Sequence, residues 1–514
     1  MQLGKIIFNA SIAIIMSALS SQAAMLDYLS PVDPTQVKPL KDSREESLYS
    51  VTTAQKAKLT KNSVKNQYEI AMQRFMQTNV KSAYMDFKIL IENVMPNDYA
   101  YLRMADSMAE IGLFDLSNLA MSRVSDKDIL SVRSDDLKRF YFPKNSLTNA
   151  DEIYLAEVYS NIMYNALSKE ATAELIKNTD LMQKSDYANY IAALGFLKAG
   201  NLKNAKFYID KALAVNPDNI NYQKLKIEVL LQDDNSKDAL KVLENIKKHS
   251  FNTTTYRSKM DTLEKYTKYK VEKDETLKKY YLALYYCSIN DDFKALRTLQ
   301  TAITGKKKTN RLVYGLMSEV YYRQKEYEKA QNFAEKSLQF GGNNKDALMV
   351  LGKVSYRNKN YKDAVKYFKA AGQDSSAMVW MAMSYSAGGN DKQAREVYYK
   401  ILKEHSDCSD AYYNVALYEK DRTVEYLKKA IAINLNSVDG WLELAKSAIA
   451  LNNTVSAGKY LDIVKYIDEN DFRYYYYQGL VCKARGLYQD ANYYFKKSLT
   501  LNPDNELAKK ELGI

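Results

Sequence analysis

The chain holds few histidines and cysteines, the side chains most often used for nucleophilic catalysis and zinc binding. It has two histidines, His249 and His405, and three cysteines among 514 residues. His405 and Cys408 have a spacing that suits two ligands of one metal ion, but no second pair accompanies them, and a zinc site needs about four ligands. Both histidines end a predicted helix, where a cation favours the negative end of the helix dipole. We therefore predict no metal site, no cofactor and no Ser-His-Asp or Cys-His catalytic arrangement.

Other short motifs also give no catalytic signal. Gly305-Lys306 resembles part of a phosphate-binding loop, but the earlier glycine is replaced by Gln300, the hydroxyl position is Lys307, and a helix rather than a strand precedes it. Asn252-Thr253-Thr254 fits a glycosylation acceptor, which has meaning only in a eukaryotic secretory pathway. Acidic pairs such as Asp291-Asp292 are expected in solvated turns. We expect a protein that is not an enzyme.

A recurring alanine indicates the elements that position the remaining side chains. It repeats at a spacing of 34 residues in the pairs Ala205 and Ala239, Ala330 and Ala364, and Ala457 and Ala491. This is the period of a helix-turn-helix unit. Such a unit cannot bury its apolar face alone, so neighbouring units must stack. With 17 Gly and 7 Pro in the chain, long helices are favoured and a β-rich fold is not expected.

The final unit shows the pattern most fully. It places large, small, small, aromatic, small and proline residues at Tyr475, Gly479, Ala491, Phe495, Ser498 and Pro503. Small residues let the two helices cross closely, Phe495 fills the space toward the next unit, and Pro503 ends the second helix. This pattern resembles the tetratricopeptide repeat. The resemblance implies an all-α fold, a right-handed superhelix of about twelve units. Candidate units are 64–97, 98–131, 151–185, 186–219, 220–253, 276–310, 311–344, 345–374, 375–408, 409–437, 438–471 and 472–505.

Two stretches break this register and divide the predicted domains. Residues 126–150 contain Pro143 and several aromatic residues, which predict an irregular loop packed on the solenoid. Residues 254–275 carry apolar side chains at helical spacing, which predicts an extra amphipathic helix. We therefore expect an N-terminal repeat block over 61–253 and a C-terminal repeat block over 276–514.

The first residues have the composition of a secretory signal. Lys5 supplies a positive charge, residues 6–19 are largely apolar, and small residues precede a cleavage site after Ala23. The apolar run is shorter than the about 20 residues that a membrane span requires. We expect a signal peptide at 1–23, a flexible proline-containing linker at 24–60, and a periplasmic or secreted mature chain without a transmembrane segment. Retention of the signal as an anchor is the alternative.

The resemblance also implies a binding surface, because the first helix of each unit lines the inner groove in tetratricopeptide-repeat proteins. Two successive units have the same dipeptide at the same position of the repeat (its address), Tyr322-Arg323 and Tyr356-Arg357. These side chains are expected to lie side by side in a row, or ladder, on the stacked units. Tyrosine offers a flat amphipathic contact, arginine a planar fork for carboxylates, and methionine an adaptable surface. The residues expected to line the groove are Tyr280, Tyr322, Arg323, Met349, Lys353, Tyr356, Arg357, Met383, Tyr413, Arg473, Tyr476 and Lys483.

Charge and groove together suggest two functions. The formal charge of +12 favours an acidic partner, an anionic membrane surface or a cell-wall polymer, whereas scattered lysines do not form the basic stripe of a nucleic-acid-binding protein. The first expectation is a non-catalytic scaffold in the cell envelope that binds protein or peptide partners. The alternative is a carbohydrate- or cell-wall-binding accessory protein, or a cryptic enzyme of envelope polysaccharide metabolism, because tyrosines stack on sugar rings.

Overall fold

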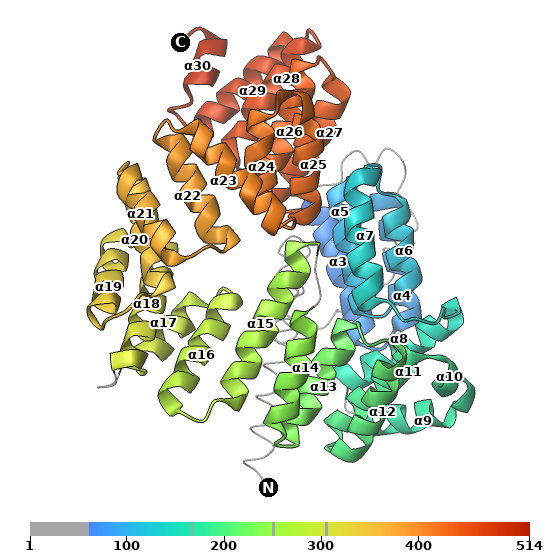
Figure 1. The fold of residues 1–514 in the computed structure, drawn as a ribbon. Coiled ribbons are helices and arrows are strands. Elements are labelled where there is room, and N and C mark those ends of the chain that lie inside the picture. The colour runs from blue at the N-terminus through green and yellow to red at the C-terminus, as the bar shows by residue number, and fades with distance from the viewer. Residues whose placement is uncertain (1–60, 166–167, 249–251, 304–306) are drawn as a thin grey trace. The chain divides into compact units, whose positions relative to one another are not determined.

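The computed structural model describes residues 61–165, 168–248, 252–303 and 307–514, and every regular element in these ranges is a helix (Figure 1). The predicted signal peptide, the cleavage site at Ala23 and the linker at 24–60 lie outside the described residues. Most of the helices pair into hairpins, in which we call the first helix A and the second helix B. The predicted all-α array of tandem hairpins is confirmed.

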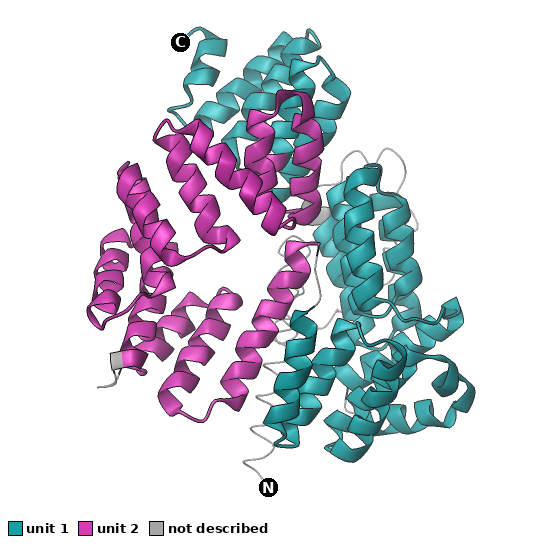
Figure 2. Ribbon diagram, in the orientation of Figure 1, with its two compact units in different colours: residues 1–249, 441–514 teal, residues 250–440 magenta. Residues whose placement is uncertain are grey.

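The array divides into two compact units (Figure 2). Unit 1 runs through residue 249 and resumes at residues 441–514, whereas unit 2 is residues 250–440. The expected C-terminal block of 276–514 is therefore shared between the units. The last hairpins belong with the N-terminal ones, although some 190 intervening residues form unit 2.

Unit 1 contains the hairpins from both ends of the described chain. Its N-terminal helices are α3 (Lys61–Met76), α4 (Val80–Ile89) with a π-helical turn (Leu90–Val94), α5 (Asp98–Glu110), α6 (Phe114–Ser122), α7 (Lys127–Tyr141), α8 (Asn149–Tyr164), α9 (Ser168–Lys177), α10 (Thr179–Lys184), α11 (Asp186–Lys198), α12 (Leu202–Val215), α13 (Ile220–Gln232) and α14 (Ser236–Lys247). Its C-terminal helices are α26 (Val438–Ala450, which begins in unit 2), α27 (Thr454–Ile467), α28 (Phe472–Ala484), α29 (Tyr488–Leu501) and α30 (Glu506–Leu512). The two sets meet at Tyr99 of α5 and Tyr466 of α27, whose ring centroids are 6.0 Å apart.

The stretch 126–150, predicted as an irregular loop, is mostly helical, which corrects that expectation. Helix α7 begins after the N-cap Asp126 and buries Ile129, Leu137 and Phe140. Pro143 lies beyond the end of this helix and does not interrupt it. Only residues 142–148 are irregular. They contact the repeats, because the Phe142 carbonyl accepts a hydrogen bond at 2.9 Å from Asn216 Nδ2 in the turn between α12 and α13.

Unit 2 consists of one long helix followed by five hairpins. The long helix is α15 (Thr254–Val271), at the position where the sequence indicates an extra helix. The A and B helices that follow are α16 (Glu275–Ser288) and α17 (Asp292–Gln300), α18 (Lys307–Arg323) and α19 (Tyr327–Gln339), α20 (Lys345–Arg357) and α21 (Tyr361–Ala371), α22 (Ser375–Ala387) and α23 (Asp391–Glu404), and α24 (Ser409–Tyr418) and α25 (Thr423–Ile433) with a 3₁₀ turn (Lys420–Arg422) between the last two.

A glycine facing an aromatic ring sets how closely two helices of a hairpin approach. A Cβ placed on Gly352 of α20 would lie 2.5 Å from the ring of Phe368, and one on Gly479 of α28 would lie 2.5 Å from the ring of Phe495. Both rings are fully buried. Because any side chain at these positions would overlap the ring, the two crossings depend on glycine.

Candidate partner-binding site

The A helices of unit 2 carry most of the predicted groove residues on one stripe each. On α20 the positions 346, 349, 353 and 356 recur every three or four residues and therefore share one side of the helix. Thirty-four residues earlier, Glu319 and Tyr322 hold the same addresses on α18 as Lys353 and Tyr356. These stripes together form the A-helix face, which consists of Tyr280, Glu319, Tyr322, Asp346, Met349, Lys353, Tyr356 and Met383.

Neighbouring A helices lie next to each other. In unit 2, α16 packs on α18, α18 on α20 and α20 on α22, whereas successive B helices in its described residues do not pack to the same extent. When successive A helices pack more closely than successive B helices, the row of hairpins curves with its A helices on the inner side. The stripes of the A-helix face therefore adjoin one another.

Lys353 has a charge partner on the preceding hairpin. Its Nζ lies 3.2 Å from Glu319 Oε2, and the two side chains are 14% and 28% exposed. The same Nζ lies 5.2 Å from the ring centroid of Tyr322 and 5.9 Å from that of Trp380. Sequence reasoning selected Lys353 but missed Glu319. The signal was available, because the two residues occupy one address of successive repeats.

Tyr322 and Tyr356 pack in the same way, as their shared address predicts. Tyr322 meets the ring of Tyr327 edge-on at a centroid distance of 5.4 Å, and Tyr356 meets Tyr361 edge-on at 5.6 Å. Burial raises the pKa of both Tyr322 and Tyr356. Each tyrosine is half-buried, so part of its surface remains exposed.

The two arginines of the predicted ladder make contacts inside the array. Arg323 forms an ion pair with Asp292 at the start of α17, and its Nη1 donates to the Cys287 carbonyl at 3.2 Å. The Arg357 guanidinium stacks on Tyr327, with Cζ 4.0 Å from the ring centroid. Each arginine therefore ties the end of an A helix to the preceding hairpin. These contacts compete with the expected role of the arginines as forks for partner carboxylates.

Two other predicted residues are core side chains, which corrects the expectation that they line an accessible groove. Tyr280 is 8% exposed, and Met349 is 6% exposed in a cluster with Phe368 and Ala377. Burial raises the pKa of Tyr280, and the nearby charge of Asp346 adds to this shift. Met383 of α22 and Tyr413 of α24 are partly exposed.

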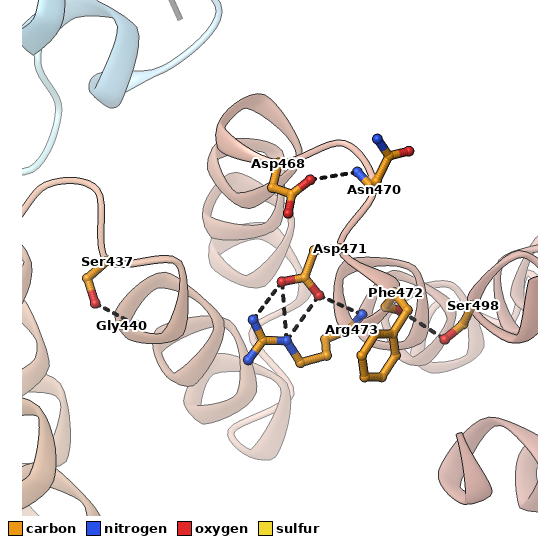
Figure 3. A network of polar contacts seen from close by, with 8 residues as sticks. All are labelled: Ser437, Gly440, Asp468, Asn470, Asp471, Phe472, Arg473 and Ser498. Carbon is orange, nitrogen blue, oxygen red and sulfur yellow. Dashed lines mark hydrogen bonds and ion pairs between the residues drawn. The ribbon is translucent and has the colours of Figure 1, made fainter. Parts of the chain in front are cut away.

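The last three predicted residues lie in unit 1 and are engaged near the C-terminus. Asp471 is the N-cap of α28 and also holds the Arg473 side chain, with Nη2 2.6 Å from Oδ2 (Figure 3). Lys483 Nζ lies 2.6 Å from Glu511 Oε2 of α30. Tyr476 packs on a cluster that Leu512 of α30 also covers. Helix α30 therefore contacts Lys483 and shares a cluster with Tyr476, while Lys483 stays exposed and Tyr476 partly exposed.

The described residues contain no group of three or more His, Cys, Asp or Glu side chains placed to hold a metal ion. None of the helices in the described part of the chain combines the length and the apolar character needed to cross a membrane.

Comparison with known proteins agrees with the hairpin architecture. Residues 316–377, which include the C-terminal part of α18 and all of α19, α20 and α21, match the family model described as tetratricopeptide repeat. The TPR repeat-containing protein MJ1428 of Methanocaldococcus jannaschii is 24% identical over 217 residues, or 37% of this chain. The matched segment also spans 37% of that relative, little more than a third of its length.

Solved structures of similar proteins were also found. The APC/C hetero-tetramer Cut9-Hcn1 matches over 91% of this chain and 98% of its own, with 11% identity and a TM-score of 0.45. A tetratricopeptide repeat protein from Parabacteroides merdae matches over 46% of this chain and 97% of its own, with 16% identity and a TM-score of 0.36. Residues 316–377 thus match the tetratricopeptide repeat, and the hairpins on either side of them have the same helix-turn-helix form.

Proposed function

We propose that this protein is a non-catalytic scaffold that binds partner proteins or peptides on the A-helix face of unit 2. The tetratricopeptide fold stacks hairpins into an extended surface suited to protein interaction. The observation that carries the proposal is that Tyr322, Tyr356 and Met383 keep partly exposed side chains on three adjoining A helices. Tyrosine rings bury a large area at a small entropic cost, and methionine adapts to varied shapes.

We also propose that the scaffold works outside the cytoplasm, in the periplasm or the cell envelope. Support comes from the charged, apolar and small-residue segments at 1–23, which have the order of a secretory signal. Mass spectrometry of the chain purified from its native host tests this. A mature N-terminus at Ala24 is expected, and an intact N-terminus in a cytoplasmic fraction would contradict export.

Site-specific photocrosslinking in cells tests the binding face with little disturbance to packing. A benzophenone-bearing phenylalanine analogue replaces Tyr322, Tyr356 or Met383, one at a time. The matched control positions are Phe293 and Tyr399, which are 75% and 42% exposed on B helices of the same unit. We expect discrete crosslinked protein adducts from the three A-helix positions and few or none from the two B-helix positions.

The outcomes separate the alternatives. Adducts from the B-helix positions alone would move the binding surface to the opposite side of the hairpins. The absence of adducts from all five positions, together with retention of the purified protein on cell-wall polysaccharide, would favour the carbohydrate-binding alternative.

A further inference from the structure

One carboxylate on the A-helix face has no partner of its own. Asp346 lies in the first turn of α20 and is half-buried. Among the described residues, its carboxylate forms no hydrogen bond or ion pair. Burial raises the pKa of Asp346, and the nearby Glu319 carboxylate raises it further. A partly desolvated carboxylate without a hydrogen-bond donor is costly, so such groups in folded proteins are usually paired.

The lysines close enough to act on Asp346 are already paired with other carboxylates. Three lysines lower its pKa through their charge, and each has a closer anion. The pairs are Lys345 with Asp374 at 3.2 Å, Lys353 with Glu319 at 3.2 Å, and Lys265 with Asp261 at 2.5 Å. This neighbourhood therefore contains three paired cations and four carboxylates, and the unmatched negative charge is that of Asp346.

We infer that Asp346 receives the guanidinium or ammonium group of a basic side chain from the peptide segment that docks on the A-helix face. The inference rests on the proposed function and specifies the charge of the partner. Tyr356 lies on the same stripe of α20 as Asp346, and Tyr322 lies on the neighbouring stripe of α18. Both tyrosines are side chains suited to binding a peptide. A basic residue flanked by apolar or aromatic residues would complement this row, because cations also bind favourably over tyrosine rings.

The chain's net positive charge led to the opposite expectation, an acidic partner. That expectation also drew on the arginines as forks for carboxylates. In the structure Arg323 pairs with Asp292, Arg357 stacks on Tyr327, and the nearby Lys353 pairs with Glu319. An acid in the first turn of a helix is also favoured by the helix dipole without any ligand. A control for this effect is therefore part of the test.

The test selects peptides from a phage-displayed library of random twelve-residue sequences on the immobilised full chain. Four proteins are compared: the wild type, Asp346→Asn, Asp346→Arg and Glu328→Gln. Glu328 is the matched control, since it is an exposed carboxylate in the first turn of a neighbouring B helix, α19. The strongest peptide is then synthesised with arginine or with citrulline, its neutral isostere, and both affinities are measured by fluorescence polarisation.

We expect the wild type and Glu328→Gln to enrich peptides with arginine or lysine flanked by apolar residues. Asp346→Asn should bind the arginine peptide about tenfold more weakly, the size expected for loss of a charge-assisted hydrogen bond, and citrulline should weaken wild-type binding by a similar factor. Asp346→Arg should shift the selection toward acidic peptides. Circular dichroism of each variant confirms that the helices are retained.

Other outcomes overturn the inference or the function separately. Enrichment without a basic residue, or with the same basic residue on Asp346→Asn, removes the role of Asp346 and leaves the docking function standing. Enrichment of acidic peptides by the wild type supports the acidic partner instead. No enrichment by any of the four proteins, together with no crosslinks from the A-helix positions, removes the proposed function itself.

Discussion

Helices α20 and α28 present the same repeat addresses in two different settings. On α20, Asp346 and Tyr356 belong to a face that continues onto the A helices of both neighbouring hairpins. On α28 the corresponding addresses hold Arg473 and Lys483, and the α28–α29 hairpin is followed by the short helix α30. Lys483 pairs with Glu511 of α30, whereas Asp346 has no partner in the described structure.

The difference shows that the position of a side chain within a repeat does not by itself determine whether the side chain can bind a partner. Helix α30 packs on α29, and its Leu512 contacts the cluster of Cys482, Ala491 and Phe495. At α28 the Lys483 ammonium is paired with Glu511 of α30, and Tyr476 packs on the cluster that Leu512 of α30 also contacts. Inside unit 2 the stacking of hairpins satisfies the core, so half-buried polar and aromatic groups can remain on the A-helix face.

The largest expected effect comes from the glycine crossings. Gly352→Val and Gly479→Val should each lower the free energy of unfolding by about 3 kcal/mol, because the new side chain overlaps a buried phenylalanine ring. Only Gly352→Val should also abolish crosslinking from Tyr322 and Tyr356, since it distorts the hairpin of the A-helix face. Chemical denaturation and the crosslinking assay measure the two effects.

Gly458→Ala is the control for these substitutions. The Cβ would meet nothing closer than 3.6 Å, and the residue lies within α27. Replacing an unneeded helical glycine should stabilise the chain by about 0.5–1 kcal/mol. Equal stability losses at Gly458 and Gly352 would show that the crossings are not specially tight.

Removal of residues 506–514 tests whether α30 covers the last full hairpin. Cys482 is 6% exposed, and burial raises the pKa of its thiol. Without α30, this thiol should gain access to solvent, and its labelling by a thiol reagent at pH 7.5 should accelerate by on the order of tenfold, with a stability loss of about 2 kcal/mol. Cys287 and Cys408 in unit 2 serve as internal controls, and unchanged labelling of Cys482 would contradict the capping role.

The two lysine–carboxylate pairs should differ in strength. The Lys353–Glu319 pair is the more buried, with side chains 14% and 28% exposed, against 51% and 20% for Lys483–Glu511. A double-mutant cycle with Lys→Met and Glu→Gln replacements should give a coupling of about 1–2 kcal/mol for the first pair and under about 0.5 kcal/mol for the second. Equal couplings would mean that the A-helix face is as solvated as the C-terminal end.

The smallest expected effect lies in the turns between A and B helices. Lys359 after α20 and Gly486 after α28 hold the same address, with φ of 60° and 77°. Lys359→Gly should gain about 0.5 kcal/mol by removing left-handed strain, and Gly486→Ala should lose about 1 kcal/mol by introducing it. Thermal unfolding measures both, and a loss of stability in Lys359→Gly would show that the lysine makes a contact that outweighs the strain.

Much of the fold followed from local pattern. The small residues at Gly479 and Ala491, the aromatic ring at Phe495 and the spacing of the repeats are determined within one hairpin, so short stretches of sequence predict them. The main local error was at residues 126–150, where Pro143 was weighted above the apolar spacing of α7. The A-helix face was predicted less completely, because Tyr322, Tyr356 and Lys353 were among the expected residues while Glu319 and Asp346 were not.

The sequence by itself determined the hairpin period, the glycine crossings and the addresses that form each A-helix stripe, because helical periodicity and short turns act over a few tens of residues. Only the tertiary structure decided which charges find partners. It pairs Arg323 with Asp292, and within unit 2 it joins Arg257 of α15 to Asp407 at 3.1 Å across 150 residues of sequence. Such pairings depend on the small rotation accumulated from hairpin to hairpin, and that rotation is set by packing between repeats rather than by any single repeat.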